Sequence, residues 1–148
     1  MGRPLPPGAE DDPQRADMYM LSTDRQRVWQ ADLECVYPGE EAYVRFLNGL
    51  AAISRGAFAP QAIIERWKGE RGPVEVQFAV DGTKYEFVHT AGDMLDPALI
   101  RTVNRSIQMS DVVFEVCDNF GMPNFILALT RDEKTRLTAR GWKFWPGI

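Results

Sequence analysis

The sequence predicts an α+β domain: a mainly antiparallel sheet of about four strands, with helices packed on one face. Two alternating apolar patterns, over residues 74–87 and 112–129, predict two hairpins. Segments with apolar residues three and four positions apart predict helices around them. Because strands joined by short turns pair with each other, two hairpins linked by one helix indicate an antiparallel sheet covered by helices.

One folded domain is expected over residues 25–148, preceded by a mobile tail over residues 1–24. The chain has 148 residues, the size of a single domain. Its first 24 residues hold four prolines and few large apolar side chains. Such a segment buries too little surface to offset the entropy lost on ordering, so we expect it to stay mobile.

The first part of the domain is expected to contain two helices. The sequence does not decide the secondary structure of the short apolar segment over residues 28–37. Residues 40–54 predict an amphipathic helix, because their apolar side chains fall on one face. Acidic residues stand at its start, and it is expected to end near Gly56. Residues 60–68 predict a second, shorter helix, with Pro60 in its first turn and Gly69 at its end.

A β-hairpin over residues 74–89 is the clearest local pattern. Large apolar residues alternate with smaller or polar ones on both sides of Asp81-Gly82, which fits a two-residue turn. The pairs expected across this turn are Val80 with Thr83, Phe78 with Tyr85, Val76 with Phe87, and Val74 with His89. This register places every large residue on one face of the hairpin.

The last part of the chain predicts a helix, a second hairpin and a final helix. Asp96-Pro97 is typical of a helix start. The Asp side chain can accept from the free N–H groups of the first turn, and Pro is tolerated there because an N–H group at that position has no partner within the helix. Residues 112–116 and 125–129 predict two further strands. Thr130 and Glu133 match a capping box that opens a helix ending near Gly141.

Composition and charge exclude several classes of protein. The longest stretch without a charge, residues 119–130, is too short to span a bilayer, and the acidic start is no export signal, so a cytoplasmic protein is expected. A net charge of −4 with interleaved acids and bases argues against nucleic-acid binding. Cys35 and Cys117 stand alone, and the common cofactor-binding motifs are absent from the sequence, so no zinc site or cofactor is expected.

Catalytic groups are few. His89 is the single histidine, and Asp93 and Asp96 follow it closely, so a small hydrolase would use these three residues. A structural histidine and an aspartate that caps a helix explain the same residues without catalysis. A non-enzymatic protein is therefore the preferred interpretation.

Candidate contact residues lie at two places near the end of the chain. The turn over residues 115–124 combines acids with apolar side chains, and the last residues carry several aromatics. Folding back onto the domain remains the alternative for both segments. Together with the acidic loop residue, the proposed partner-binding set is Asp93, Asp118, Asn119, Phe120, Met122, Trp142 and Trp145.

Five segments of the sequence carry a family resemblance: GAFAPQAIIERWKG, VEVQFAVDGTKYEF, GDMLDPALIRTVN, FEVCDNFGMPNFILALTRDEKTRL and RGWKF. Over about residues 40–145 the chain resembles small bacterial α+β immunity proteins, the partners of secreted toxins. The resemblance implies a cytoplasmic protein that binds a toxin domain, expected to be basic, and occludes it. A homo-oligomeric or adaptor domain with its terminal aromatics in a self-interface is a further alternative.

Overall fold

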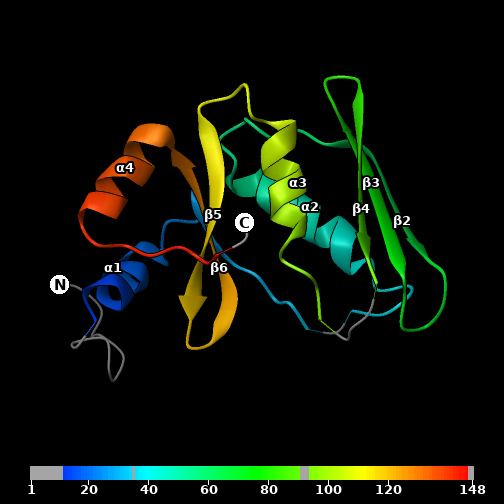
Figure 1. The fold of residues 1–148 in the computed structure, drawn as a ribbon, viewed down its shortest axis with the longest axis horizontal. Coiled ribbons are helices and arrows are strands. Elements are labelled where there is room, and N and C mark those ends of the chain that lie inside the picture. The colour runs from blue at the N-terminus through cyan, green and yellow to red at the C-terminus, as the bar shows by residue number, and fades with distance from the viewer. Residues whose placement is uncertain (1–11, 35, 91–93, 147–148) are drawn as a thin grey trace.

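The fold has two three-stranded antiparallel sheets and two layers of helices (Figure 1). The computed structural model describes residues 12–34, 36–90 and 94–146. Their elements are α1 (Pro13–Leu21), β1 (Val28–Gln30), α2 (Ala42–Ile53), β2 (Gln61–Trp67), β3 (Val74–Val80), β4 (Thr83–His89), α3 (Leu99–Ser106), β5 (Val112–Asn119), β6 (Met122–Thr130) and α4 (Arg131–Ala139). The sheets have the strand orders β1-β6-β5 and β2-β3-β4.

The layer of α2 and α3 lies between the two sheets and forms the main core (Figure 1). Phe58 joins the sheets within this core. Its ring meets Phe78 of β3 edge to face, with 5.7 Å between centroids, and Phe114 of β5 at 6.2 Å. Edge-to-face pairs at these separations are favourable, so the three rings hold the two sheets on either side of the helices.

A second, smaller core lies on the other face of the β1-β6-β5 sheet, against α1, α4 and the C-terminal segment. It contains Met18, Cys117, Phe125 and Trp142, together with other apolar side chains. Both faces of this sheet are therefore buried, which explains the unbroken apolar run over residues 125–129. A strand with one exposed face would show alternation there.

The hairpin at Asp81-Gly82 has the expected register. The structure pairs Val80 with Thr83, Phe78 with Tyr85, Val76 with Phe87, and Val74 with His89. The inward residues of β3 are buried against α2 and α3. The capping box before α4 is also confirmed: the Thr130 hydroxyl accepts from the Glu133 N–H, and the Glu133 carboxylate accepts from the Thr130 N–H.

The α+β class is confirmed, but the arrangement within it differs from the expectation. There are two sheets rather than one of about four strands, and helices cover both faces of β1-β6-β5. The segment over residues 60–68 is strand β2, not a helix. It pairs antiparallel with β3 and contains a bulge beside Ala62, so its backbone groups bond across the sheet instead of along a helix.

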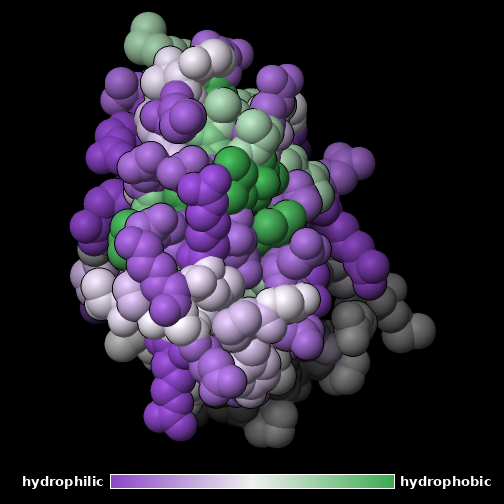
Figure 2. All heavy atoms as spheres, turned by 90° about the vertical axis from the view of Figure 1, so that its right-hand side faces the viewer, coloured by the Kyte–Doolittle hydropathy of each residue, from purple (hydrophilic) through white to green (hydrophobic). Residues whose placement is uncertain are grey.

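The outer face of β2-β3-β4 is open to solvent (Figure 2). Its side chains are mainly polar, with a Lys68–Glu75 ion pair and a hydrogen bond from Gln77 to Glu86. Ile64 and Val88 are exposed apolar residues on its outer strands. Figure 2 shows a small apolar group on this side surrounded by hydrophilic residues, as expected for a sheet with one solvated face.

The expected mobile tail over residues 1–24 is wrong for Pro13–Leu21, which form α1. Asp12 caps this helix by accepting from the N–H groups of Gln14 and Arg15. The Gln14 side chain bonds the N–H and C=O of Lys143, and Asp17 accepts from Arg140 and from the Trp142 indole. These polar contacts attach α1 to the C-terminal segment.

Met18→Ala is expected to lower the free energy of unfolding by about 2 kcal/mol, because it empties a buried site in the second core. Met18 is 5% exposed, whereas Met20 in the same helix is 55% exposed. Met20→Ala is thus a matched control, expected to stay within about 0.5 kcal/mol of the parent. Urea denaturation of both variants measures the difference. Equal losses in the two variants would contradict the packing of α1 described above.

Candidate protein-binding site

The tip of the β5–β6 hairpin presents the most prominent exposed aromatic of the proposed set. Phe120 is 61% exposed and occupies the turn with Gly121. Both residues have positive φ, 53° and 87°. Glycine tolerates this backbone, but an aromatic residue rarely adopts it, because its Cβ meets the neighbouring backbone.

The other hairpin shows what this turn ordinarily contains. Asp81 and Gly82 have φ angles of 51° and 79°, almost the same conformation. Asp is common at the first of these positions, since its short side chain tolerates the left-handed region. The turn therefore does not need the large aromatic that Phe120 supplies.

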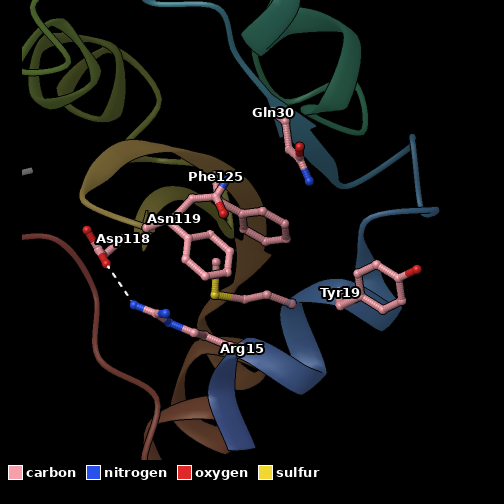
Figure 3. Close-up of a pocket in the computed structure, with 8 residues that line it drawn as sticks. Arg15, Tyr19, Gln30, Asp118, Asn119 and Phe125 are labelled. Atoms are coloured by element: carbon pink, nitrogen blue, oxygen red, sulfur yellow. Dashed lines mark ion pairs between the residues drawn. The ribbon is translucent and has the colours of Figure 1, made fainter. Parts of the chain in front are cut away.

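Residues of α1 support the tip from the side (Figure 3). The Arg15 guanidinium lies over the Phe120 ring, 4.4 Å from its centroid, and its Nη2 is 3.7 Å from Asp118 Oδ2. Asp118 Oδ1 also accepts from the Gly121 N–H at 3.0 Å. Asp118 therefore shares the Arg15 guanidinium with Asp12, whose Oδ2 lies 3.4 Å from Arg15 Nε, while the Phe120 ring makes a cation–π contact with the same group.

A small cavity of about 60 Å³ lies between α1 and the tip (Figure 3). It is lined from α1 by Arg15 and Tyr19, from the hairpin by Asp118 and Phe120, and by Gln30 of β1. Phe120, Tyr19 and Gln30 also line a wider groove of about 720 Å³ that runs between β1 and α2. The tip thus stands where two depressions meet, the usual setting for an aromatic anchor and its surroundings.

The remaining residues of the proposed contact set have different surroundings. Asn119 pairs with Met122 across the turn, and its side-chain amide donates to Asn124 Oδ1. Both Asn119 and Met122 are half-buried. They support the tip and contribute part of its surface.

The terminal tryptophans do not join the tip. Trp142 is 4% exposed and belongs to the second core, with its indole N–H bonded to Asp17. Trp145 is half-buried against the main core, and its N–H donates to the Val116 C=O at 2.6 Å. Both therefore hold the C-terminal segment on the domain. Asp93 lies outside the described residues.

No protein-family model, curated protein or solved structure matches this chain significantly. The site must therefore be interpreted from its own geometry.

Two residues of the hydrolase alternative, His89 and Asp96, are connected through Tyr43. The Tyr43 hydroxyl lies 2.7 Å from His89 Nδ1 and accepts from the Asp96 N–H at 3.2 Å. The Asp96 carboxylate is turned to the Ala98 N–H just before α3. Burial raises the pKa of Tyr43 to about 12, so this phenol keeps its proton at ordinary pH. The cluster ties together α2, β4 and the segment before α3.

Metal binding and membrane spanning have no candidates in the part of the chain that is described. Residues 12–34, 36–90 and 94–146 hold no group of three His, Cys, Asp or Glu side chains placed for a metal ion. Their helices are all too short or too polar to cross a bilayer. Cys117 is a free thiol in the second core, and its burial raises the pKa to about 12, so it stays protonated.

The sequence does not predict the α1 half of the site, because the prolines and few large apolar residues of residues 1–24 are typical of a mobile tail. A usable signal was present in Asp12-Pro13, the same Asp-Pro pattern that predicted the helix after Asp96. Apolar residues at positions 18 and 21 follow it at helical spacing. Arg15 and Tyr19 could have been placed on a helix, although not beside Phe120.

Proposed function

We propose that this protein is a non-catalytic binding module that acts as an immunity protein, occluding a toxin domain. The observation that carries the proposal is Phe120: a large, mostly exposed aromatic at a turn position whose left-handed backbone does not call for an aromatic side chain and rarely holds one. Strained residues concentrate where a protein acts on something else. Aromatic anchors of this kind supply much of the binding energy in protein interfaces.

Charge supports a basic partner. The net charge of −4 produces a field that attracts a basic protein during encounter. At the tip itself Arg15 faces both Asp12 and Asp118 and offsets part of the local acidic charge. The acidic character of the whole molecule therefore influences the association rate, whereas Phe120 influences how long the complex lasts.

Phe120→Ala is expected to raise the dissociation rate of the complex about 30-fold, the equivalent of roughly 2 kcal/mol for a lost anchor. The association rate should change much less. The probe is a purified basic toxin domain against which this protein protects cells, measured by surface binding kinetics at two salt concentrations. Association should slow at the higher salt, because exposed charges are screened.

Met109→Ala provides the matched control. Met109 is 95% exposed and precedes β5, at the opposite end of that strand from the tip. It should bind like the parent. Cells that express the toxin domain should survive with the parent and the Met109 variant, and less well with Phe120→Ala. Failure of the parent to protect cells would overturn the immunity function, and unchanged dissociation of Phe120→Ala would remove the tip from the interface.

A further inference from the structure

Strand β1 forms one edge of the β1-β6-β5 sheet. Ladder bonds beside it run from the Ala31 N–H to the Asn124 C=O and from the Ala128 N–H to the Arg27 C=O. Bonded and non-bonded residues alternate along an antiparallel pair. The backbone groups of Val28 and Gln30 therefore point away from β6, toward the open side of the sheet.

Most of these edge groups have no partner within the described residues. The Val28 N–H donates to the Asp24 C=O at 2.9 Å. The structure gives no hydrogen bond from residues 12–34, 36–90 or 94–146 to the Val28 C=O or to the N–H and C=O of Gln30. Unpaired edge groups of this kind are a template for another strand.

The opposite edge of the same sheet is covered. On β5, the Asn104 side chain accepts from the Phe114 N–H at 2.8 Å and donates to the Phe114 C=O at 2.9 Å. The Trp145 N–H occupies the Val116 C=O. One edge is thus closed by dedicated contacts, while the β1 edge remains available.

A groove runs along the free edge. Its volume is about 720 Å³, and its floor is formed by Val28, Trp29 and Gln30. Tyr19 and the tip residue Phe120 line one side, and Ala52 of α2 lines the other. Neighbouring strands lie about 4.8 Å apart, so an added strand would run between these walls.

Charges at the two ends of the groove determine which charges an added strand should carry at its own two ends. Arg25 lines the groove before β1, while Asp32 and Glu34 line a second depression beyond β1, here called the extension, which shares Trp29 and Gln30 with the groove. None of the three forms an ion pair within the described residues. Arg45 also lines the extension, where the two carboxylates outnumber it.

We propose that the free edge of β1 pairs with an extended segment of the partner protein, antiparallel to β1. A basic residue near the N-terminal end of that segment would meet Asp32 and Glu34, and an acidic residue near its C-terminal end would meet Arg25. This inference rests on the proposed function, because the segment belongs to the partner that Phe120 anchors. Backbone bonds supply the pairing, which is more stable per residue in the antiparallel direction, and the end charges select segments with a basic start and an acidic end.

The test uses the full chain labelled with ¹⁵N and the peptide acetyl-Lys-Thr-Val-Thr-Val-Thr-Glu-amide. Binding should shift the Gln30 amide resonance and slow its hydrogen exchange about tenfold or more, since this N–H gains a partner. The charge-reversed peptide, with Glu first and Lys last, should bind about tenfold more weakly, because its end contacts are repulsive in the antiparallel alignment and are restored only in the less stable parallel one. Equal binding of the two peptides, or an unchanged Gln30 amide at millimolar peptide, would overturn the proposal.

Two variants separate this inference from the proposed function. Ala52→Trp fills the groove from an exposed position on α2 and should abolish peptide binding. Ala139→Trp makes the same change at an exposed position on α4 and should leave it intact. Full toxin-domain binding by Ala52→Trp would overturn strand pairing while leaving the function at Phe120 standing. A dimer of this chain that the peptide does not dissociate would assign the edge to a second copy and likewise overturn the proposal.

Discussion

Phe78→Ala is expected to lower the free energy of unfolding by about 3–5 kcal/mol, the largest effect among the changes considered. Phe78 is fully buried at the centre of β3. Its ring meets Phe58 edge to face and stacks on Tyr85 with 5.6 Å between centroids. Removing it leaves a cavity between the β2-β3-β4 sheet and the helical layer, and both ring contacts are lost.

Urea denaturation measures this loss, with the slope of the transition checked for constancy. Val88→Ala, on the exposed face of the same sheet, is the control and should change stability by less than about 0.5 kcal/mol. A loss below about 1 kcal/mol for Phe78→Ala would show that this face of the hairpin is not the core.

Asn104→Ala is expected to cost about 2–4 kcal/mol, because it leaves two backbone groups of a buried residue without partners. The Asn104 side chain satisfies both the N–H and the C=O of Phe114, whose side chain is fully buried. The Asn104 amide thus makes the two hydrogen bonds that a neighbouring strand would otherwise make to Phe114 at this edge of β5. Deletion of this amide therefore uncovers the edge as well as weakening the packing of α3.

Hydrogen exchange of the Phe114 amide separates these effects. In Asn104→Ala its protection should fall far more than that of amides in β6, which keep their ladder bonds. Arg105→Ala, an exposed neighbour in the same helix, should leave the Phe114 amide protected. If Phe114 stays protected in Asn104→Ala, another group must cover this edge.

The local elements with strong chemical signals were predictable. The β3–β4 hairpin has the expected register because side-chain alternation and an Asp-Gly turn permit only one pairing that puts Phe78 and Tyr85 on the same face. The capping box before α4 involves residues only three positions apart. In both cases the determining interactions lie within a few residues of each other.

Strand β2 was predicted wrongly because its inward face carries a charged residue. Ile63, Glu65 and Trp67 alternate toward the helices, but a glutamate in this pattern hides the period of a strand. Glu65 Oε1 accepts from the N–H groups of Tyr43 and Val44 at the start of α2, and Oε2 accepts from the Trp67 indole. Glu65 thus caps a helix that lies more than twenty residues earlier in the chain.

The candidate site divides in the same way. The sequence indicated the turn around Phe120 as a candidate contact surface, because an apolar residue between turn residues is a local feature, but it left open whether Phe120 folds back onto the domain. The position of Arg15 over that ring depends on α1 docking against the C-terminal segment through Gln14 and Asp17. No sequence pattern within α1 or within the β5–β6 turn predicts that contact.

Local sequence patterns were enough for the α+β class, the two hairpins and the approximate positions of α2, α3 and α4, since turns, caps and side-chain periods act over short distances. The tertiary structure alone decided that the strands form two sheets, that one of them is buried on both faces, and that β1 has a free edge beside a groove. These features depend on contacts such as Asn104 with Phe114 and Asp17 with Trp142, made by residues that local sequence patterns do not connect. They arise because each amphipathic element must bury its apolar face against a partner that only the folded chain supplies.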